Sequence, residues 1–558
     1  MPNVRSRGYI ALLIIVPVLL AVFGATGPVA AETTFTVNRI GDASDLNLAN
    51  SACDTSTNSG KQCTLRAAIE EANDTPGADT INFNITSTSK VIAPGSPLPP
   101  ITDQLTIDGY TQTGASPNTQ AVGNNAVLKI VLDGVNAGEE AIGLDLAGYR
   151  VTVKGLVIQR FEGTGVALSG TKSDVVGNRI GTNAAGTLAR GNGVGLLVTG
   201  DQNTIGGTAP AARNLFSGNS RHGIRMSGAD AVGNEVLGNY VGTTATGNAA
   251  LGNGEWGMTV GGGASLNRVG GTTAGSRNLF SANGNDGIAL LGGDSNEVSG
   301  NLIGTKADGS GDLGNTDNGI MVAGSSDNLI GGTRSAAANV VSGNGGTGID
   351  LYGTASFDNV ARGNVVRAND GDGISVSSRR AVVAGNVIFG NGLAGIEVFA
   401  FSSAPASRNR ITGNQIFGNG KLGIDLIGGA ENPAGVTSND TDDADSGPND
   451  LQNFPLLTSA VRSGTTNVTT VVGSLNSNPS TQFTIELFIV LAVDASGHGE
   501  GQVLYASQNV TTNSGGDAGF AFQVGGLSPG TVLTATATST SAGNTSEFAA
   551  NRTVVPGP

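Results

Sequence analysis

In the C-terminal third of a short repeated pattern, in which a glycine precedes an apolar residue, a variable residue and a second apolar residue, three acidic residues occupy the variable position. They are Asp350 in GIDL, Glu397 in GIEV and Asp425 in GIDL. If these segments stack as parallel strands, Glu397 and Asp425 lie about 5 Å apart, which suits the carboxyl pair of a retaining glycosidase. Asp350 and Glu397 are then about 10 Å apart, slightly beyond the range of an inverting pair.

Close carboxyl groups raise one another's proton affinity, so such a row contains both an acid and a base near neutral pH. Asp370 and Asp372, in the turn NDGDGI, are expected to flank the same face. The alternative interpretation is that these residues are acidic because they meet water. The sequence favours it, since no lysine stands at the variable position and no aromatic platform for a sugar is evident.

His222 is one of two histidines and invites a catalytic interpretation. RHGI is similar to the His-Gly-Ile stretch of polygalacturonases, but the other motifs of those enzymes have no counterpart on neighbouring units. RNLFSGNSRHGIRM (213–226) is repeated as RNLFSANGNDGIAL and ANVVSGNGGTGIDL, which place Asp286 and Thr347 opposite His222. The repeat therefore favours a turn residue. His498 lies in a glycine-rich loop without an evident partner.

A lyase of the pectate type would need aspartates that hold calcium and a basic residue that removes a proton. Arg225 is the basic residue at the variable position, and it lies far along the repeats from the acidic third. The sequence therefore gives this mechanism little support.

An acidic segment, SNDTDDADSGPND, supplies several hard oxygen ligands within a short loop that contains glycine, as calcium prefers. The spacing is not that of an EF-hand, because no glutamate closes the loop at its twelfth position. A solvated acidic hinge is the alternative. The candidate calcium ligands are Asp440, Asp442, Asp443, Asp445, Asn449 and Asp450.

The composition excludes some functions. Glycine makes up 89 of 558 residues, whereas charged residues are only 13% and hydrophobic residues 38%. Regularly placed Val, Ile and Leu among glycine and asparagine predict many short strands joined by turns. The net charge of −15 argues against a nucleic-acid partner.

The segment 1–31 is predicted to be an export signal. Arg5 and Arg7 precede the apolar stretch 9–23, and Val-Ala-Ala at 29–31 forms a small-residue cleavage site. Cleavage moves the net charge from −15 to −17. No other segment approaches the roughly 18 apolar residues of a membrane helix, so a secreted chain without a transmembrane segment is expected.

The two cysteines, Cys53 and Cys63, are ten positions apart. In an exported protein this predicts a structural disulfide. A reactive thiol pair is the alternative, but it lacks a nearby histidine and a CxxC spacing.

A repeat defines the fold. GNRIGT (177–182) returns as GNYVGT (238–243) and as GNLIGT (300–305), and IGGT-like motifs fall halfway between. Each period thus holds two units of about 30 residues, as in a solenoid. Eleven glycine-led strands between positions 143 and 426 follow one another too closely for crossover helices. Parallel stacking predicts an all-β fold, a right-handed single-stranded parallel β-helix about 50 Å long.

Alternation points the variable residues of the eleven strands outward. This outward column is Asp145, Ala167, Leu197, Arg225, Thr259, Ala289, Met321, Asp350, Ser375, Glu397 and Asp425. Asparagines at the corners are expected to form hydrogen bonds from coil to coil. They are Asn178, Asn219, Asn239, Asn283, Asn301, Asn344 and Asn386.

The exposed ends of such a rod need covers. CTLRAAIEEAN (63–73) predicts an amphipathic helix with Thr64 as its N-cap, and alternating segments after 455 predict an antiparallel β-sandwich. The expected organisation is a signal peptide (1–31), an N-terminal cap (32–100), β-helix repeats (101–437), an acidic linker (438–454) and the β-sandwich (455–558).

The segment FTVNRIGDASDLN…CTLRAAIEEANDTPGADTINF (35–83) resembles the CSLREA domain of exported bacterial proteins, although its hexamer CTLRAA departs from the form that names the family. LPPITDQLTIDGYTQTGAS (98–116) and the repeats are similar to the right-handed β-helix that commonly follows this domain. DADSGPNDLQNFP and GHGEGQ resemble the C-terminal β domain of these proteins. The resemblance implies an architecture and no particular reaction.

These observations favour a secreted, non-catalytic β-helix protein that acts as a binding or surface-structural element towards polysaccharides or cell-surface glycans. The alternative is a polysaccharide-degrading enzyme, a glycoside hydrolase or lyase, that uses Asp350, Glu397 and Asp425. Surface attachment, if any, is expected to be non-covalent, because no sorting motif or lipidation cysteine is evident.

Overall fold

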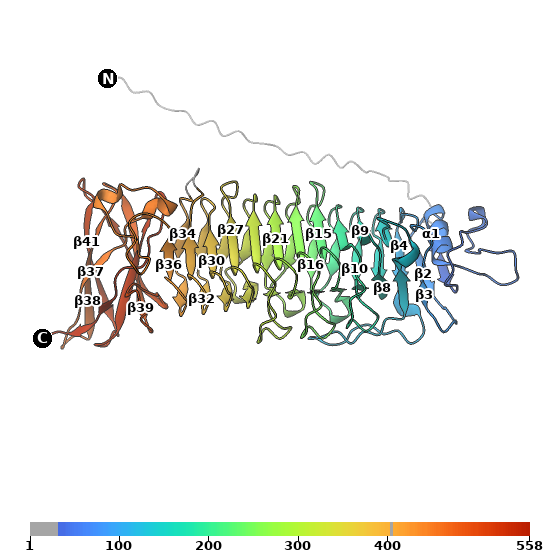
Figure 1. The fold of residues 1–558 in the computed structure, drawn as a ribbon, viewed down its shortest axis with the longest axis horizontal. Coiled ribbons are helices and arrows are strands. Elements are labelled where there is room, and N and C mark those ends of the chain that lie inside the picture. The colour runs from blue at the N-terminus through green and yellow to red at the C-terminus, as the bar shows by residue number, and fades with distance from the viewer. Residues whose placement is uncertain (1–31, 402–405) are drawn as a thin grey trace, which may run out of the picture.

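The computed structural model describes residues 32–401 and 406–558, and the predicted export signal at 1–31 lies outside these residues. Three long parallel sheets form a rod, with a helix at one end and two small sheets at the other (Figure 1). The fold is a right-handed parallel β-helix, as the repeats predict. No helix in the described ranges has the length and apolar character needed to span a lipid bilayer.

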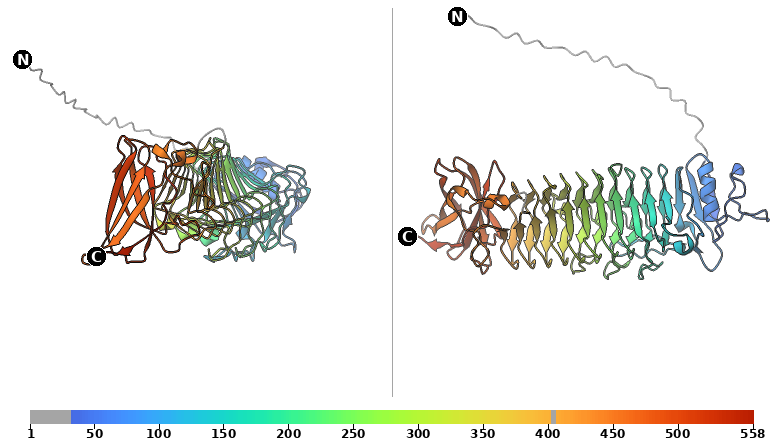
Figure 2. Two further views of the ribbon diagram at one scale, coloured as in Figure 1. Left: turned by 60° about the vertical axis from the view of Figure 1, so that its left-hand side comes forward. Right: turned by 45° about the horizontal axis from the view of Figure 1, so that its top comes forward.

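Each coil contributes one strand to each sheet, as β7 (Thr152–Lys154), β8 (Leu156–Gln159) and β9 (Thr164–Leu168) do in succession. The 13-stranded sheet runs from β1 (Thr34–Val37) to β34 (Arg410–Thr412), and the 12-stranded sheet from β3 (Val91–Ile92) to β35 (Gln415–Phe417). Figure 2 shows these strands stacked one above another along the rod.

The eleven predicted glycine-led strands form the third sheet. Its apolar positions are buried, as Ile349 and Leu351 are on either side of Asp350. The sheet contains, in order, β6 (Leu144–Leu146), β9, β12 (Val194–Val198), β15 (Ile224–Ser227), β18 (Met258–Gly261), β21 (Ile288–Leu291), β24 (Ile320–Ala323), β27 (Ile349–Tyr352), β30 (Ile374–Val376), β33 (Ile396–Val398) and β36 (Ile424–Leu426).

Buried asparagines link the coils, as predicted. Asn301 donates from Nδ2 to Oδ1 of Asn339 at 3.1 Å and accepts from Nδ2 of Asn278 at 2.9 Å. The seven predicted asparagines fall into two such ladders. One ladder is Asn178, Asn214, Asn239, Asn278, Asn301, Asn339, Asn364, Asn386 and Asn414, and the other is Asn192, Asn219, Asn253, Asn283, Asn315, Asn344, Asn369, Asn391 and Asn419.

The glycine of the IGT motif is required by the close approach of coils. Gly304 has φ +76°, and a Cβ atom there would lie 2.2 Å from the carbonyl oxygen of Ser342 on the next coil. Only glycine adopts this left-handed conformation and also leaves that space free.

The N-terminal end is covered by α1 (Leu65–Asp74). Thr64 caps the helix as predicted and accepts a hydrogen bond from the backbone of Ala67 at 3.1 Å. The predicted disulfide joins Cys53 to Cys63. β1 pairs in parallel with β2 (Asp79–Phe83), so the stacked sheets extend into the region expected to be a separate cap.

Two four-stranded sheets follow the β-helix, and all but one of their strand pairs are antiparallel. One sheet contains β41 (Asp517–Gly525), β38 (Val468–Asn476), β37 (Leu456–Arg462) and β44 (Val555–Pro556). The other contains β40 (Val503–Thr511), β39 (Gln482–Val490), β42 (Val532–Ser539) and β43 (Arg552–Thr553).

Three buried glutamates of this C-terminal region meet the last coil, one at the end of each long sheet. Glu486 accepts from Gly413 N–H, and Glu500 accepts from Asn419 Nδ2 at 2.8 Å. Glu547 accepts from the backbone N–H of Leu426. These glutamates accept hydrogen bonds from N–H groups of the last coil, which a further coil would pair with if the β-helix continued.

Candidate functional site

The outward residues of β27, β30, β33 and β36 form an acidic row. Asp350 is the register partner of Ser375, Ser375 that of Glu397, and Glu397 that of Asp425. Since neighbouring strands lie about 4.8 Å apart, Glu397 is one step from Asp425 and two steps from Asp350. The three sequence-predicted site residues therefore lie in one column on one sheet.

Asp350, on β27, is the first residue of this row in chain order. Its Oδ1 atom is buried and has no hydrogen-bond partner among the described residues. Burial raises the pKa of Asp350 to about 7, and the negative charges of Asp286 and Asp317 add to the shift. The hydrogen bond with Ser375 acts in the opposite direction and lowers the pKa of Asp350. At neutral pH this carboxyl group is therefore part protonated and can donate as well as accept a hydrogen bond.

Glu397 and Asp425 continue the row. Burial, together with the charges of Asp372 and Asp425, raises the pKa of Glu397 to about 7. Burial and the charge of Glu431 raise the pKa of Asp425 to about 6, and its Oδ1 is also buried without a hydrogen-bond partner in the described ranges. These two neighbouring carboxyl groups hold and release protons close to neutral pH.

The flanking aspartates differ from each other. Asp372 is buried, 6% exposed, and accepts a hydrogen bond of 2.8 Å from the backbone of Ala394 on the next coil. Its charge acts on Glu397, so it flanks the row as expected. Asp370 is exposed.

Lys421 supplies a positive charge that the sequence analysis missed. It precedes β36 and lowers the pKa of Glu397, of Asp425 and of Asp372 against the effect of burial. The sequence analysis looked for lysine in the outward column alone, whereas Lys421 stands in the turn, two residues before the glycine of GIDL. Arg221 occupies the same turn position before GIRM, and that correspondence could have found it.

A cavity of about 870 Å³ lies where the row meets the C-terminal region. Lys421, Asp425 and Glu431 line it from the last coil, and Asp494 and Glu500 line it from the loop before β40. The acidic row therefore ends at a recess and not at an open edge.

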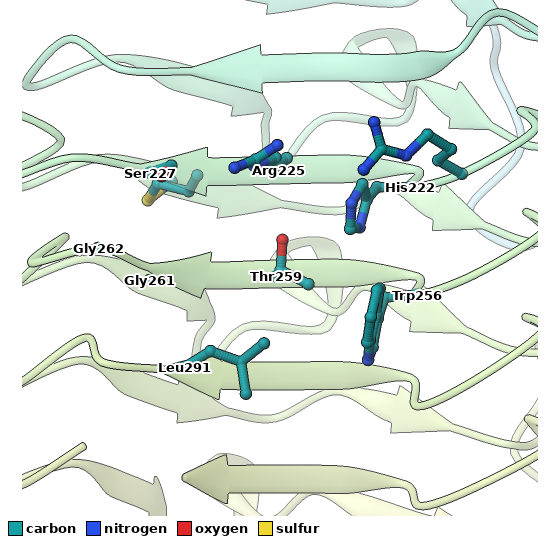
Figure 3. A pocket seen from close by; sticks show the side chains of 10 residues that line it. His222, Arg225, Ser227, Trp256, Thr259, Gly261, Gly262 and Leu291 are labelled. Atoms are coloured by element: carbon teal, nitrogen blue, oxygen red, sulfur yellow. The ribbon is translucent and has the colours of Figure 1, made fainter. Parts of the chain in front are cut away.

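A second pocket lies on the same face at β15 and β18 (Figure 3). His222 is in the turn before β15, as the repeat predicts, but the residue is only 5% exposed and its ring stacks on Trp256 with centroids 5.2 Å apart. Burial, with the charges of Arg225 and Arg221, lowers the pKa of His222 to about 4. The aromatic pair was missed, although EWGM repeats RHGI one coil on.

Hydrogen bonds along the turns lead from this pocket to the turn before β27. Trp256 Nε1 donates to Asp286 Oδ2 at 3.1 Å, and Asn318 N–H donates to Asp286 Oδ1 at 3.0 Å. Thr347 N–H then donates to Asn318 Oδ1 at 2.8 Å. Burial raises the pKa of Asp286 to about 6.

The candidate calcium ligands are only partly brought together. Asp440, Asp443 and Asp445 each offer an oxygen within 4.8 Å of the others. Asp443 also accepts hydrogen bonds from Asn453 N–H at 2.7 Å and from Ser477 Oγ at 2.9 Å. Three carboxylates therefore lie close enough to share one cation.

The other three candidate ligands have different surroundings. Asn449 is fully buried and accepts from the backbone N–H of Asn409, where it prolongs a corner of the β-helix. Asp450 accepts from Asn544 Nδ2 at 2.6 Å, and Asp442 lies beside Gly516. The acidic segment thus packs against its neighbours at Asp443 and Asn449, whereas Asp450 is exposed.

His498 lies in the loop before β40, between Ser496 and Glu500 of the cavity lining, but does not line the cavity itself. Its Nδ1 is 3.0 Å from the carbonyl oxygen of Phe548, and its ring meets Phe454 edge to face. These contacts are structural.

Comparison with known proteins agrees with this architecture. The family model described as "Right handed beta helix region" matches residues 312–449. The molecule is thus a right-handed parallel β-helix protein. A search of curated proteins gives no match.

Similar solved structures include the A-module of the mannuronan C-5 epimerase AlgE4 from Azotobacter vinelandii, at 15% identity over 67% of this chain and 96% of that chain, with a TM-score of 0.35. The enzymatically active domain of tailspike protein 2 from bacteriophage CBA120 is 12% identical over 89% of this chain and 74% of its own, with a TM-score of 0.25. Pectate lyase Pel9A is 13% identical over 73% of this chain and 88% of its own, with a TM-score of 0.26. At this level the similarity is one of fold alone.

Proposed function

We propose that this is a secreted protein that binds a glycan along the outward face of the eleven-stranded sheet without cleaving it. The observation that carries the proposal is the continuity of that face. Trp256 of the stacked pair donates a hydrogen bond to Asp286, whose charge adds to burial in raising the pKa of Asp350, the first acid of the row. A long face with apolar rings at one place and a row of carboxyl groups at another suits a polymer of sugars.

The acidic row supports the same proposal. Because the pKa values of Asp350 and Glu397 are raised to about 7, these groups are part protonated at neutral pH. They offer both donors and acceptors to sugar hydroxyls.

A glycan array probed with the secreted chain, with and without calcium, tests the proposal. We expect binding to one class of polysaccharide, weakened at least tenfold in the double variant Asp350→Asn, Glu397→Gln. The matched control is Glu139→Gln, an exposed acid in a turn before β6, which should bind as the wild type does. Absence of binding to every glycan, or equal binding by the double variant, would contradict the proposal.

A polysaccharide-degrading enzyme is the second candidate, and one observation favours it. Glu397 and Asp425 are register partners on adjacent strands, and a spacing of about 5 Å is that of a retaining pair. Glu397, with its pKa raised to about 7, would act as the general acid and Asp425 as the nucleophile. In this case the wild type releases reducing sugar from a polysaccharide panel and Glu397→Gln releases orders of magnitude less. Release of no sugar from any substrate leaves only the binding proposal.

A further inference from the structure

The pocket at β15 and β18 has a volume of about 230 Å³ and opens on the outward face of the sheet (Figure 3). Arg225 and Thr259 are register partners in the outward column, and His222 and Trp256 stand beside them in the turns. The lining is therefore a guanidinium group, a hydroxyl group and two stacked rings within one small space.

The pocket is positively charged in an acidic protein. The side chain of Arg225 is exposed, and its guanidinium group makes no hydrogen bond or ion pair within the described ranges, although its backbone pairs in the sheet. Arg221 lies 3.8 Å from Glu255, which offsets its charge, and His222 is neutral at pH 7 because its pKa is lowered to about 4. The free charge of the pocket thus belongs to Arg225, in a chain whose net charge is −15.

Other polar groups of the pocket also lack partners. Nδ1 of His222 is buried and accepts no hydrogen bond from the described part of the chain. The hydroxyl groups of Ser227 and Thr259, which line the same pocket, have no hydrogen-bond partner there either. Buried polar groups are usually paired, so the unpaired Nδ1 of His222 is unusual, and the two hydroxyl groups are free to form hydrogen bonds with a ligand.

We propose that this pocket binds an anionic substituent of a saccharide, a carboxylate or sulfate group, with Arg225 as the anion-binding residue. A guanidinium group forms paired, charge-assisted hydrogen bonds to such a group, and Thr259 and Ser227 contact the neighbouring sugar hydroxyls. Trp256 provides the apolar wall against which the sugar ring packs. The inference rests on the proposed function in one respect, that the ligand is a saccharide.

The position of the pocket gives the bound chain a direction. Arg225 is four strand steps from Asp350, which corresponds to about 19 Å. A negative substituent is attracted at Arg225 and repelled along the row from Asp350 to Asp425. A glycan on this face therefore lies with its anionic sugar at β15 and its less charged sugars at the acidic row.

Trp256 makes the test direct, because it is the single tryptophan among 558 residues. Its fluorescence reports the state of this pocket and of no other site. The secreted chain is titrated at constant ionic strength with glucuronic acid, with glucose and with sodium sulfate. We expect a saturable change with glucuronic acid, and none with glucose at the same concentrations.

Variants identify the anion-binding residue. Arg225→Gln should weaken the binding of glucuronic acid at least tenfold, and Arg225→Lys should weaken it less, because a lysine keeps the charge and loses the paired geometry. Arg334→Gln removes an exposed arginine before β26 (Val340–Ser342) and should leave the titration unchanged.

Three outcomes would overturn the inference. They are no saturable change with glucuronic acid, an equal affinity in Arg225→Gln, and binding of inorganic sulfate as tight as that of glucuronic acid, which would mean that the sugar is not recognised. The proposed function fails separately. A glycan that binds the face while glucuronic acid leaves Trp256 unaffected contradicts only this inference, whereas glucuronic acid bound through Arg225 with no polysaccharide bound contradicts only the broader proposal.

Discussion

Trp256 and Asp286 lie on successive coils and are joined by a hydrogen bond of 3.1 Å from the indole Nε1 to Oδ2. Asp286 in turn raises the pKa of Asp350, one end of the acidic row. The two candidate binding areas, the aromatic pocket and the carboxyl row, are thus parts of one electrostatically connected face. The charges of both areas would therefore act on a ligand bound to this face.

Lys421 is expected to set the protonation of the row. Its ammonium group favours the ionised form of Glu397 and Asp425, so Lys421→Met should raise the pKa of both, by up to about 1 unit. Carbon-detected NMR titration of the carboxyl groups measures this. Lys61→Met, at an exposed lysine near the N-terminal end, is the control and should leave both pKa values unchanged. Unchanged values in Lys421→Met would place the ammonium group away from the row.

Glu547 is expected to make the junction with the C-terminal region less stable as pH rises. Burial raises its pKa from 4.5 to about 8, and the charge of Asp425 adds to this. A carboxyl group with a raised folded-state pKa contributes stability that is present below about pH 4.5 and is lost as pH rises through 8. The melting temperature should therefore fall between pH 5 and pH 8.

The variant Glu547→Gln isolates this contribution from that of the other buried acids. It cannot ionise, so its melting temperature should depend less on pH than that of the wild type, although it loses one hydrogen bond to Leu426 or Thr437. Parallel pH profiles of the two proteins would show that Glu547 does not titrate in this range.

The asparagine ladders are expected to be a major source of stability. Asn301→Ala removes the partners of Asn278, Asn339 and the carbonyl oxygen of Val269, all inside the β-helix. Each buried group left unpaired costs about 1–3 kcal/mol, so the free energy of unfolding should fall by roughly 3–5 kcal/mol. Denaturant unfolding measures it.

Asn248→Ala is the matched control, because Asn248 is exposed and uses only its backbone N–H in a hydrogen bond. Its effect should stay within about 0.5 kcal/mol. Similar losses for both variants would mean that the ladder bonds add little beyond the backbone pairing of the sheets.

Calcium is expected to raise the melting temperature by a few degrees if Asp440, Asp443 and Asp445 share one ion. Asp445→Asn removes one negative ligand, whose Oδ1 is buried without a partner in the described residues, and should abolish the increase. Asp450 lies outside the trio, so the variant Asp450→Asn should keep the calcium-dependent increase in melting temperature. A melting temperature that is the same with calcium and with EDTA would mean that no calcium binds and that hydrogen-bond donors of the protein alone stabilise the three carboxylates.

The sequence determined the rod and its outward column. Alternation decides which residues face out, and a parallel solenoid turns the recurrence of the glycine-led pattern into contact between adjacent strands. For this reason the placing of Asp350, Glu397 and Asp425 in one column, and the helix capped by Thr64, could be predicted without coordinates.

The tertiary structure decided what surrounds that column. The residues that approach the column from turns are Lys421, His222 and Trp256. In a turn, neither the alternation of a strand nor the repeat of about 30 residues fixes the direction of a side chain. Their approach to the face therefore depends on packing between coils. Glu500 and Glu547 reach the last coil from positions far along the chain from their partners, Asn419 and Leu426. Such contacts depend on how the C-terminal sheets dock, which repeats within the β-helix do not encode.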